Sequence, residues 1–225
     1  TRRPVGAVAS FFLTLGTVIK WAGWLASPLL LLPLVVLALG RPVAPVAETL
    51  SRFLDRISGA ALGFAMVMSV LMLAAQLAVV IARYVFGLAF SWLSETVIYS
   101  FAAMFLVAAA SALRDDEHVR VDILRQRYGA KARAAIELGG TYLLLIPICI
   151  LIFWSAISPS FVRSWAQFEA SRESDGLPIL FLFRTLVPVF AALLLAQGLS
   201  QALKAALVLR GLRAPEALHA QGGGA

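Results

Sequence analysis

Four long apolar runs, each bounded by a charged residue on at least one side, decide what this chain can fold into. They occupy residues 57–82, 96–113, 138–157 and 185–203. A bilayer core requires about 20 apolar residues in a helix, and each run is close to or above that length. An isolated strand in lipid would leave its backbone groups unpaired, so each run must be helical. The sequence therefore predicts an all-α integral membrane protein with four transmembrane helices.

The composition agrees with a lipid environment. Hydrophobic residues make up 61% of the chain and charged residues only 14%, more apolar surface than a water-soluble domain of this length could bury. The net charge of +7 does not indicate nucleic-acid binding, because the basic residues cluster at the ends of the apolar runs. We therefore expect membrane lipids, and no nucleic acid, among the partners.

The distribution of Lys and Arg predicts the orientation of the four helices. Basic residues are frequent before the first run, in the 114–133 loop and after the last run, and they are sparse on the opposite side, where we find Arg83, Arg163, Arg172 and Arg184. Cytoplasmic loops carry the excess of Lys and Arg. The 114–133 loop and the C-terminus are therefore predicted to be cytoplasmic, and the 83–95 turn and the 158–178 loop to face outward.

The segments outside the four-helix domain, residues 57–210, have a different character. Residues 1–40 form a hydrophobic, membrane-associated extension, which is either one further span, giving five in total, or a shallow helical hairpin. Residues 41–56 are predicted to be a cytoplasmic amphipathic connector. Residues 211–225 are expected to be a flexible tail.

Two segments have the pattern of interfacial amphipathic helices. One places apolar side chains on a single helical face, formed by Val46, Leu50, Phe53, Leu54 and Ile57. The other, on the predicted outer side, has Phe161, Trp165 and Phe168 at positions i, i+4 and i+7. Trp is favoured at the membrane interface, so both segments are expected in the headgroup plane.

The sequence lacks the residues of membrane enzymes. Haem ligation usually requires paired ligands within the spans, but the two histidines, His118 and His219, lie in predicted cytoplasmic segments. The predicted spans contain neutral polar side chains and no ionisable relay. Residues 115–118 either form a solvated acidic loop or bind a cation. We expect no enzyme activity, no cofactor in this chain, and no transport by this chain alone.

An ordered set of motifs resembles a known family. Arg83-Tyr84 and Phe86 precede Ser91-Trp92 with Ser94-Glu95; residues 118–122 read HVRVD, and residues 171–178 read SRESDGLP. Over roughly residues 57–210 the chain resembles the small membrane subunit (DctQ-like) of tripartite ATP-independent periplasmic (TRAP) transporters. It departs from the usual pattern at Thr96, where a second acid is common, and at residues 115–117, where a basic-glycine turn is common.

The resemblance implies a function shared with two partners. In this family a large membrane subunit carries the substrate and sodium, and a periplasmic substrate-binding protein delivers the substrate. The small subunit is expected to be a scaffold in the bacterial inner membrane, in a sodium-gradient-driven symporter for organic acids. The 171–178 motif resembles the branch for 2-oxo acids and related monocarboxylates. The alternatives are a membrane-anchor subunit of a redox or biogenesis complex and an autonomous small transporter.

The same motifs supply candidate residues for the interface with a partner subunit. These candidates are Arg83, Ser91, Trp92, Ser94, Glu95, His118, Arg120, Asp122, Arg172, Glu173 and Arg184. Alternatively, Arg83 and Glu95 only anchor helix ends, where the dipole favours their charges. Residues 118–122 are either an exposed turn or a set of paired charges. Arg184 either extends its side chain towards the interface or pairs with Glu173 or Asp175.

The second apolar run carries a face of small residues. Ala102, Ala103, Val107, Ala110 and Ser111 recur at helical spacing, and small residues permit close packing of membrane helices. We therefore predict that Ala103 and Ala110 contact the partner subunit. The alternative is that this face meets lipid or the chain's own helices.

Overall fold

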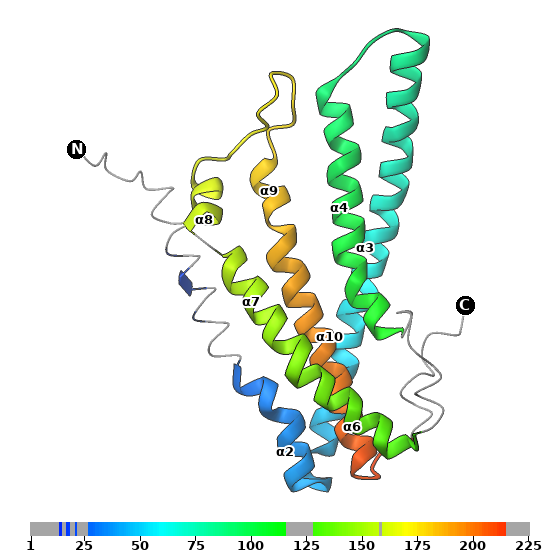
Figure 1. Ribbon diagram of the computed structural model, residues 1–225, viewed down its shortest axis with the longest axis vertical. Coiled ribbons are helices and arrows are strands. Elements are labelled where there is room, and N and C mark those ends of the chain that lie inside the picture. The colour runs from blue at the N-terminus through cyan, green and yellow to red at the C-terminus, as the bar shows by residue number, and fades with distance from the viewer. Residues whose placement is uncertain are drawn as a thin grey trace, which may run out of the picture. The chain divides into compact units, whose positions relative to one another are not determined.

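The computed structural model describes residues 27–115, 128–157 and 159–214, together with the single positions Thr14, Thr17, Val18 and Trp21 (Figure 1). Helices account for the regular structure of this part of the chain. Four of them are long and apolar enough to cross a membrane, with bounds Arg41–Val85, Ser91–Arg114, Ala130–Ala156 and Leu180–Leu209. The prediction of an all-α protein with four membrane-spanning helices is confirmed.

Several of these spans are built from more than one helical segment. The first comprises the short 3-10 helix η2 (Arg41–Val43) and α3 (Ala44–Val85), and the second is α4 (Ser91–Arg114). The third comprises α6 (Ala130–Gly140), the π-helical turn η3 (Thr141–Leu145) and α7 (Ile146–Ala156). After α8 (Pro159–Ala166), the fourth comprises α9 (Leu180–Arg184) and α10 (Leu186–Leu209).

Helix α3 is much longer than a membrane crossing requires. Its 42 residues correspond to a length of about 63 Å, twice the thickness of a hydrocarbon core of about 30 Å. Residues 44–56 of the predicted connector therefore belong to the same continuous helix as the first span, and their place at the membrane interface stays a prediction. On the predicted apolar face Val46 and Phe53 are exposed and Leu54 is buried, and the neighbouring face contributes the buried Ala47, Ser51 and Asp55.

The N-terminal extension contributes one short helical piece to the described chain. The 3-10 helix η1 (Ser27–Leu31) and α2 (Leu32–Leu39) together form an apolar segment shorter than a bilayer crossing. Val36 on α2 is fully buried, in a cluster with Leu54 of α3 and Leu203 of α10. Segment 27–39 therefore packs on the ends of longer helices. Apart from the four single positions, residues 1–26 lie outside the described residues.

The chain divides into two compact units. Of the described residues, those within 62–108 and 152–190 lie in the first unit, and those within 27–61, 109–151 and 191–214 lie in the second. In the second unit small residues allow helices to pack closely, and Ala202, Ala205 and Ala206 of α10 are almost completely buried. A side chain at Gly198 would collide with Leu145, so glycine is required where α10 meets η3.

The first unit contains the α3–α4 hairpin and an aromatic cluster. Gly87 in the hairpin turn has φ +65°, a left-handed conformation that glycine adopts without strain. Phe181 of α9 packs edge-on against Trp165 and Phe168, with ring centroids 4.9 Å and 5.5 Å apart. The predicted stripe 161–168 does not continue as one helix, because α8 ends at Ala166 and Phe168 has φ +46°. The second predicted interfacial segment is thus a short helix packed against α9.

Candidate functional site

The Glu95 carboxylate binds the 171–177 loop to the first turns of α4. Its Oε1 accepts a hydrogen bond from the Ser171 hydroxyl, and its Oε2 accepts one from the backbone N–H of Leu177 at 2.7 Å. The loop is itself closed by a hydrogen bond from Ser171 N to Leu177 O at 3.1 Å. Both carboxylate oxygens are therefore used by groups of the same chain. Charge-assisted hydrogen bonds of this kind are stronger than neutral ones.

Asp175 makes the reciprocal contact from the loop to α4. Its Oδ2 accepts a hydrogen bond from the backbone N–H of Ser91, the first residue of α4, at 2.9 Å. The first N–H groups of a helix have no partner within the helix, so a distant carboxylate satisfies one of them. This hydrogen bond holds the pKa of Asp175 below its usual value. The contact therefore stabilises the fold above the ordinary pKa of aspartate, and that contribution is lost as the pH falls through the lowered pKa.

Gly176 allows the two carboxylate contacts to coexist. A Cβ atom at this position would lie 2.9 Å from Glu95 Oε1 and would collide with Ser171. Only glycine leaves room for the loop to approach α4 so closely. We name the cluster of Ser91, Glu95, Ser171, Asp175 and Leu177 the outer lock. It joins the two motifs SW-SE and SRESDGLP, which lie about 80 residues apart in the chain.

The other predicted residues of the outer turn do not join this cluster. The Ser94 hydroxyl donates a hydrogen bond to the backbone carbonyl of Phe90, just before α4, at 3.3 Å. Trp92 is 44% exposed and packs against Phe90, with ring centroids 6.0 Å apart. Arg83, in the last turn of α3, and Arg172 and Glu173, in the loop, have exposed side chains. The structure thus separates Ser91 and Glu95, which bind residues of the same chain, from Trp92, Arg83, Arg172 and Glu173, whose side chains are exposed.

Arg184 pairs with a different acid from those expected. Its Nη2 lies 3.0 Å from Glu169 Oε1, and both side chains are about one-third exposed. Of the two alternatives, outward extension or pairing with Glu173 or Asp175, the second named the wrong acids, since Asp175 instead accepts a hydrogen bond from Ser91 N. At the next residue, Thr185, the side-chain oxygen Oγ1 accepts a hydrogen bond from Trp165 Nε1 at 3.2 Å. These two contacts fix the α8 segment to the beginning of the fourth span.

A second polar cluster, in the second unit, centres on Asp55 of α3. Lys204 Nζ lies 2.6 Å from Asp55 Oδ2, and both residues are buried. Asp55 Oδ1 accepts hydrogen bonds from Ser200 Oγ at 2.7 Å and from Gln197 Nε2 at 3.3 Å. The side-chain oxygen Oε1 of Gln197 in turn accepts a hydrogen bond from Ser58 Oγ at 2.6 Å. We name this cluster of Asp55, Ser58, Gln197, Ser200 and Lys204 the inner network.

Helix α4 is bound to the same cluster. Ser111 Oγ donates to Ser58 O at 2.6 Å, and Arg114 Nη1 donates to Asp55 O at 3.3 Å. Gln201 Nε2 also donates to the carbonyl of Leu113. Three helices are therefore joined by charged and polar groups with satisfied hydrogen bonds, which removes the cost of burying those groups unpaired.

Sequence reasoning missed the inner network because it treated the span interiors as neutral and Lys204 as a flanking residue. A signal was present. Gln197, Ser200, Gln201 and Lys204 recur at three- and four-residue spacing, which is a polar stripe on one face of an otherwise apolar helix. A matching stripe on α3 is formed by Ser51, Asp55 and Ser58. Two such stripes of complementary charge predict a buried helix contact.

A family model matches residues 72–207, which lie within the region containing the four spans. Its description is tripartite ATP-independent periplasmic transporters, DctQ component. The chain belongs to the DctQ family. It is thus the small membrane component of a TRAP transporter, and DctQ components function with a large membrane subunit and a substrate-binding protein. No curated protein and no solved structure matches this chain.

The small-residue face of α4 in this DctQ chain is buried by the chain itself. Ala103 is 6% exposed and Ala110 is fully buried, and Val107 and Ser111 are buried with them. The prediction that Ala103 and Ala110 contact the large subunit is therefore wrong: small side chains were needed for packing among the DctQ helices. The other alternative, contact with the chain's own helices, is the one observed.

The motif HVRVD at residues 118–122, the third motif of the resemblance, has no described structure. His118, Arg120 and Asp122 lie outside the described residues, as do Asp116 and Glu117 of the acidic run. Among residues 27–115, 128–157 and 159–214, no group of three or more His, Cys, Asp or Glu side chains gathers as metal ligands would. The chemistry of the two described clusters in DctQ is accordingly that of hydrogen bonding and ion pairing, which position helices and a loop.

Proposed function

We propose that this chain is the scaffold subunit of a sodium-gradient-driven, binding-protein-dependent symporter for organic acids. The observation that carries the proposal is the family match over residues 72–207. In this division of labour the large subunit moves the substrate with sodium, and this chain holds part of the surrounding membrane scaffold. The 171–178 motif favours 2-oxo acids and related monocarboxylates as the substrate class.

The polar clusters support a scaffold role over a transport role. A proton or ion relay needs ionisable groups that can exchange partners along a pathway. Here the buried Asp55 is paired with Lys204 and holds two further hydrogen bonds, and Glu95 uses both oxygens on the outer loop. Groups bound in this manner keep helices in register, as a stationary element requires.

Reconstitution separates the scaffold role from autonomous transport. Liposomes containing only this chain are expected to show no uptake of radiolabelled pyruvate, with or without an inward sodium gradient. Liposomes that also contain the large subunit, supplied with the binding protein, should take up pyruvate when the sodium gradient is present. Liposomes with the large subunit alone are the matched control. Sodium-dependent uptake by this chain alone would contradict the scaffold proposal.

The basic residues support an orientation in which the 114–133 loop and the C-terminus are cytoplasmic. In a Cys149→Ala background, cysteines at Gln126 and Ala217 are expected to resist a membrane-impermeant maleimide in intact cells. A cysteine at Ser174, in the exposed outer loop, should react. The readout is labelling before and after permeabilisation. Labelling of position 126 from outside would reverse the proposed topology.

The exposed outer residues are the remaining candidates for contact with the partners. The side chains of Trp92, Arg83, Arg172 and Glu173 are exposed. Aromatic and arginine side chains are enriched among residues that contribute most to binding energy. We assign Trp92 to the large-subunit contact and the 172–173 pair to the side on which the binding protein docks, in keeping with the outward orientation of this loop.

A further inference from the structure

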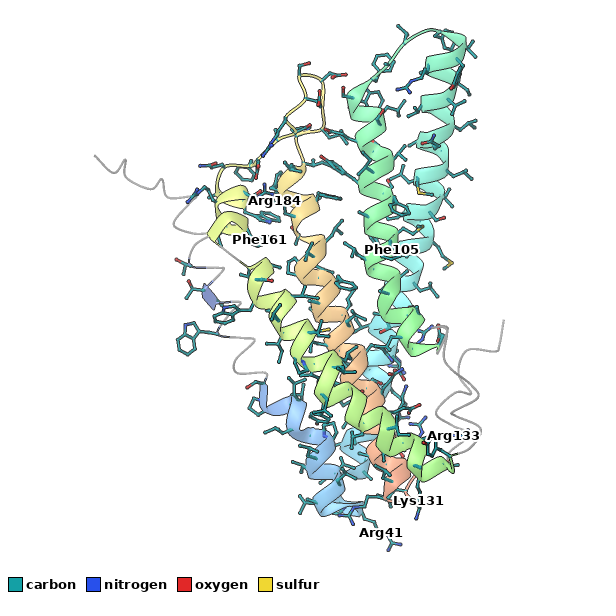
Figure 2. The ribbon with its side chains drawn as sticks, in the orientation of Figure 1. Arg41, Phe105, Lys131, Arg133, Phe161 and Arg184 are labelled. Carbon is teal, nitrogen blue, oxygen red and sulfur yellow. The ribbon has the colours of Figure 1, made fainter. Side chains whose placement is uncertain are left out.

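A small cavity lies at the ends of two spans in the first unit. Its volume is about 280 Å³, and its apolar walls include Leu106, Phe161, Phe183 and Val187. Arg184 completes the lining, with Ser155 and Ala156. Figure 2 labels Phe161 and Arg184 on neighbouring elements of this region, and α8 packs against α9 there. The cavity is thus an apolar recess with one cationic side chain in its wall.

The cavity lies where membrane-spanning segments end. Ala156 is the last residue of the span Ala130–Ala156, and Arg184 is in the first turns of the span Leu180–Leu209. Trp165 packs nearby on Phe181, and tryptophan is enriched at the level of lipid headgroups. The apolar part of the recess therefore faces the hydrocarbon boundary, and the guanidinium group lies near the level of the phosphates.

Arg184 has hydrogen-bonding capacity beyond its ion pair. Guanidinium carries five N–H donors in a planar fork that suits carboxylate and phosphate oxygens. Within the described residues, one side-chain hydrogen bond from Arg184 is formed, to Glu169 at 3.0 Å. The Glu169 contact orients the fork and leaves donors for a second anion. Phosphodiester groups are the abundant anions at this depth of a membrane.

We propose that this cavity binds one phospholipid, with its phosphate at Arg184 and the upper part of one acyl chain in the apolar recess. The size of the recess fits such an occupant: it is at the lower limit of the pockets that enclose whole small molecules, about 300 Å³. It therefore takes a segment of a chain whose remainder stays in the bilayer. An amphiphilic anion matches both features of the site: its charged group suits Arg184, and its apolar part suits the apolar lining.

Native mass spectrometry of the full chain in detergent, titrated with phosphatidylglycerol, tests the proposal. Arg184→Gln is expected to weaken phosphatidylglycerol binding about tenfold, as loss of one charge-assisted hydrogen bond predicts. Val187→Phe, which fills the recess and keeps the cation, should weaken it similarly. Arg163→Gln is the matched control, because Arg163 is an exposed arginine on α8 that does not line the cavity. Its binding should equal that of the unchanged chain.

Two further measurements distinguish this site from a structural ion pair or a simple anion site. Glu169→Gln removes the competing carboxylate, so phosphatidylglycerol binding should be retained or strengthened. Glycerophosphoglycerol, which has the headgroup without acyl chains, should not displace the lipid at equal concentration. Equal binding by the Arg184→Gln and Arg163→Gln variants, loss of binding in Glu169→Gln, or displacement by the headgroup alone would each overturn the proposal.

Discussion

Replacing Asp55 with alanine is expected to destabilise the chain by about 3–5 kcal/mol, because Lys204 would be left buried without its counter-charge. For a chain of this size the change corresponds to a fall of roughly 6–20 °C in the unfolding temperature. Cys149, the single cysteine of the chain, is buried in the same unit. A dye that fluoresces on reaction with thiols therefore reports unfolding in detergent from one native position.

The ion pair itself is distinguished from general damage by variants that remove both charges. Asn at position 55 keeps an oxygen acceptor for Ser200 and Gln197, so the double variant Asp55→Asn, Lys204→Met should recover most of the lost stability. Glu48→Ala removes an acid from the same helix at a partly exposed position and should change the unfolding temperature little. If Asp55→Ala and Glu48→Ala unfold at the same temperature, the inner network does not hold the helices together.

The number of spans and their helical nature could be predicted from the sequence, and the reason is physical. A hydrocarbon core imposes a minimum apolar length, and each span meets it without help from distant residues. The helix boundaries were not predicted, because the apolar runs stop at the first charged residues and a helix can continue beyond them. In α3 the helix continues through Ser51 and Asp55, and there Ser200 Oγ donates to the Ser51 backbone carbonyl and to Asp55, which also pairs with Lys204.

The candidate site was predicted only in part, because the decisive contacts join residues far apart in the chain. The motifs around Ser91 and Glu95 were recognised, but nothing in local spacing connects them with Ser171 and Asp175. For Arg184 the sequence left outward extension and pairing with Glu173 or Asp175 open, and neither alternative named Glu169. Glu169 follows Phe168, whose positive φ could not be predicted from the residue pattern.

The outer lock makes the second strong prediction: Glu95→Ala should release the 171–177 loop from α4. The variant loses two charge-assisted hydrogen bonds, to the Ser171 hydroxyl and to Leu177 N–H. Each such bond contributes about 1.5–3 kcal/mol, so the Leu177 amide should exchange at least tenfold faster with deuterium. Hydrogen exchange of the 169–179 peptide, followed by mass spectrometry, measures the effect.

Three further variants show whether the carboxylate itself holds the loop. Glu95→Gln keeps one side-chain oxygen and should give an intermediate rate, whereas Gly176→Ala keeps the charge and should still release the loop, because its Cβ would press on Ser171 and Glu95. Glu173→Gln is the matched control: its side chain is exposed, and the contact of this residue with Ser171 is made by its backbone N–H. Exchange in Glu173→Gln should match the unchanged chain. Equal exchange in Glu95→Ala and Glu173→Gln would mean that the loop is held without the Glu95 carboxylate. The contact between the 91–95 and 171–178 motifs would then contribute nothing to stability.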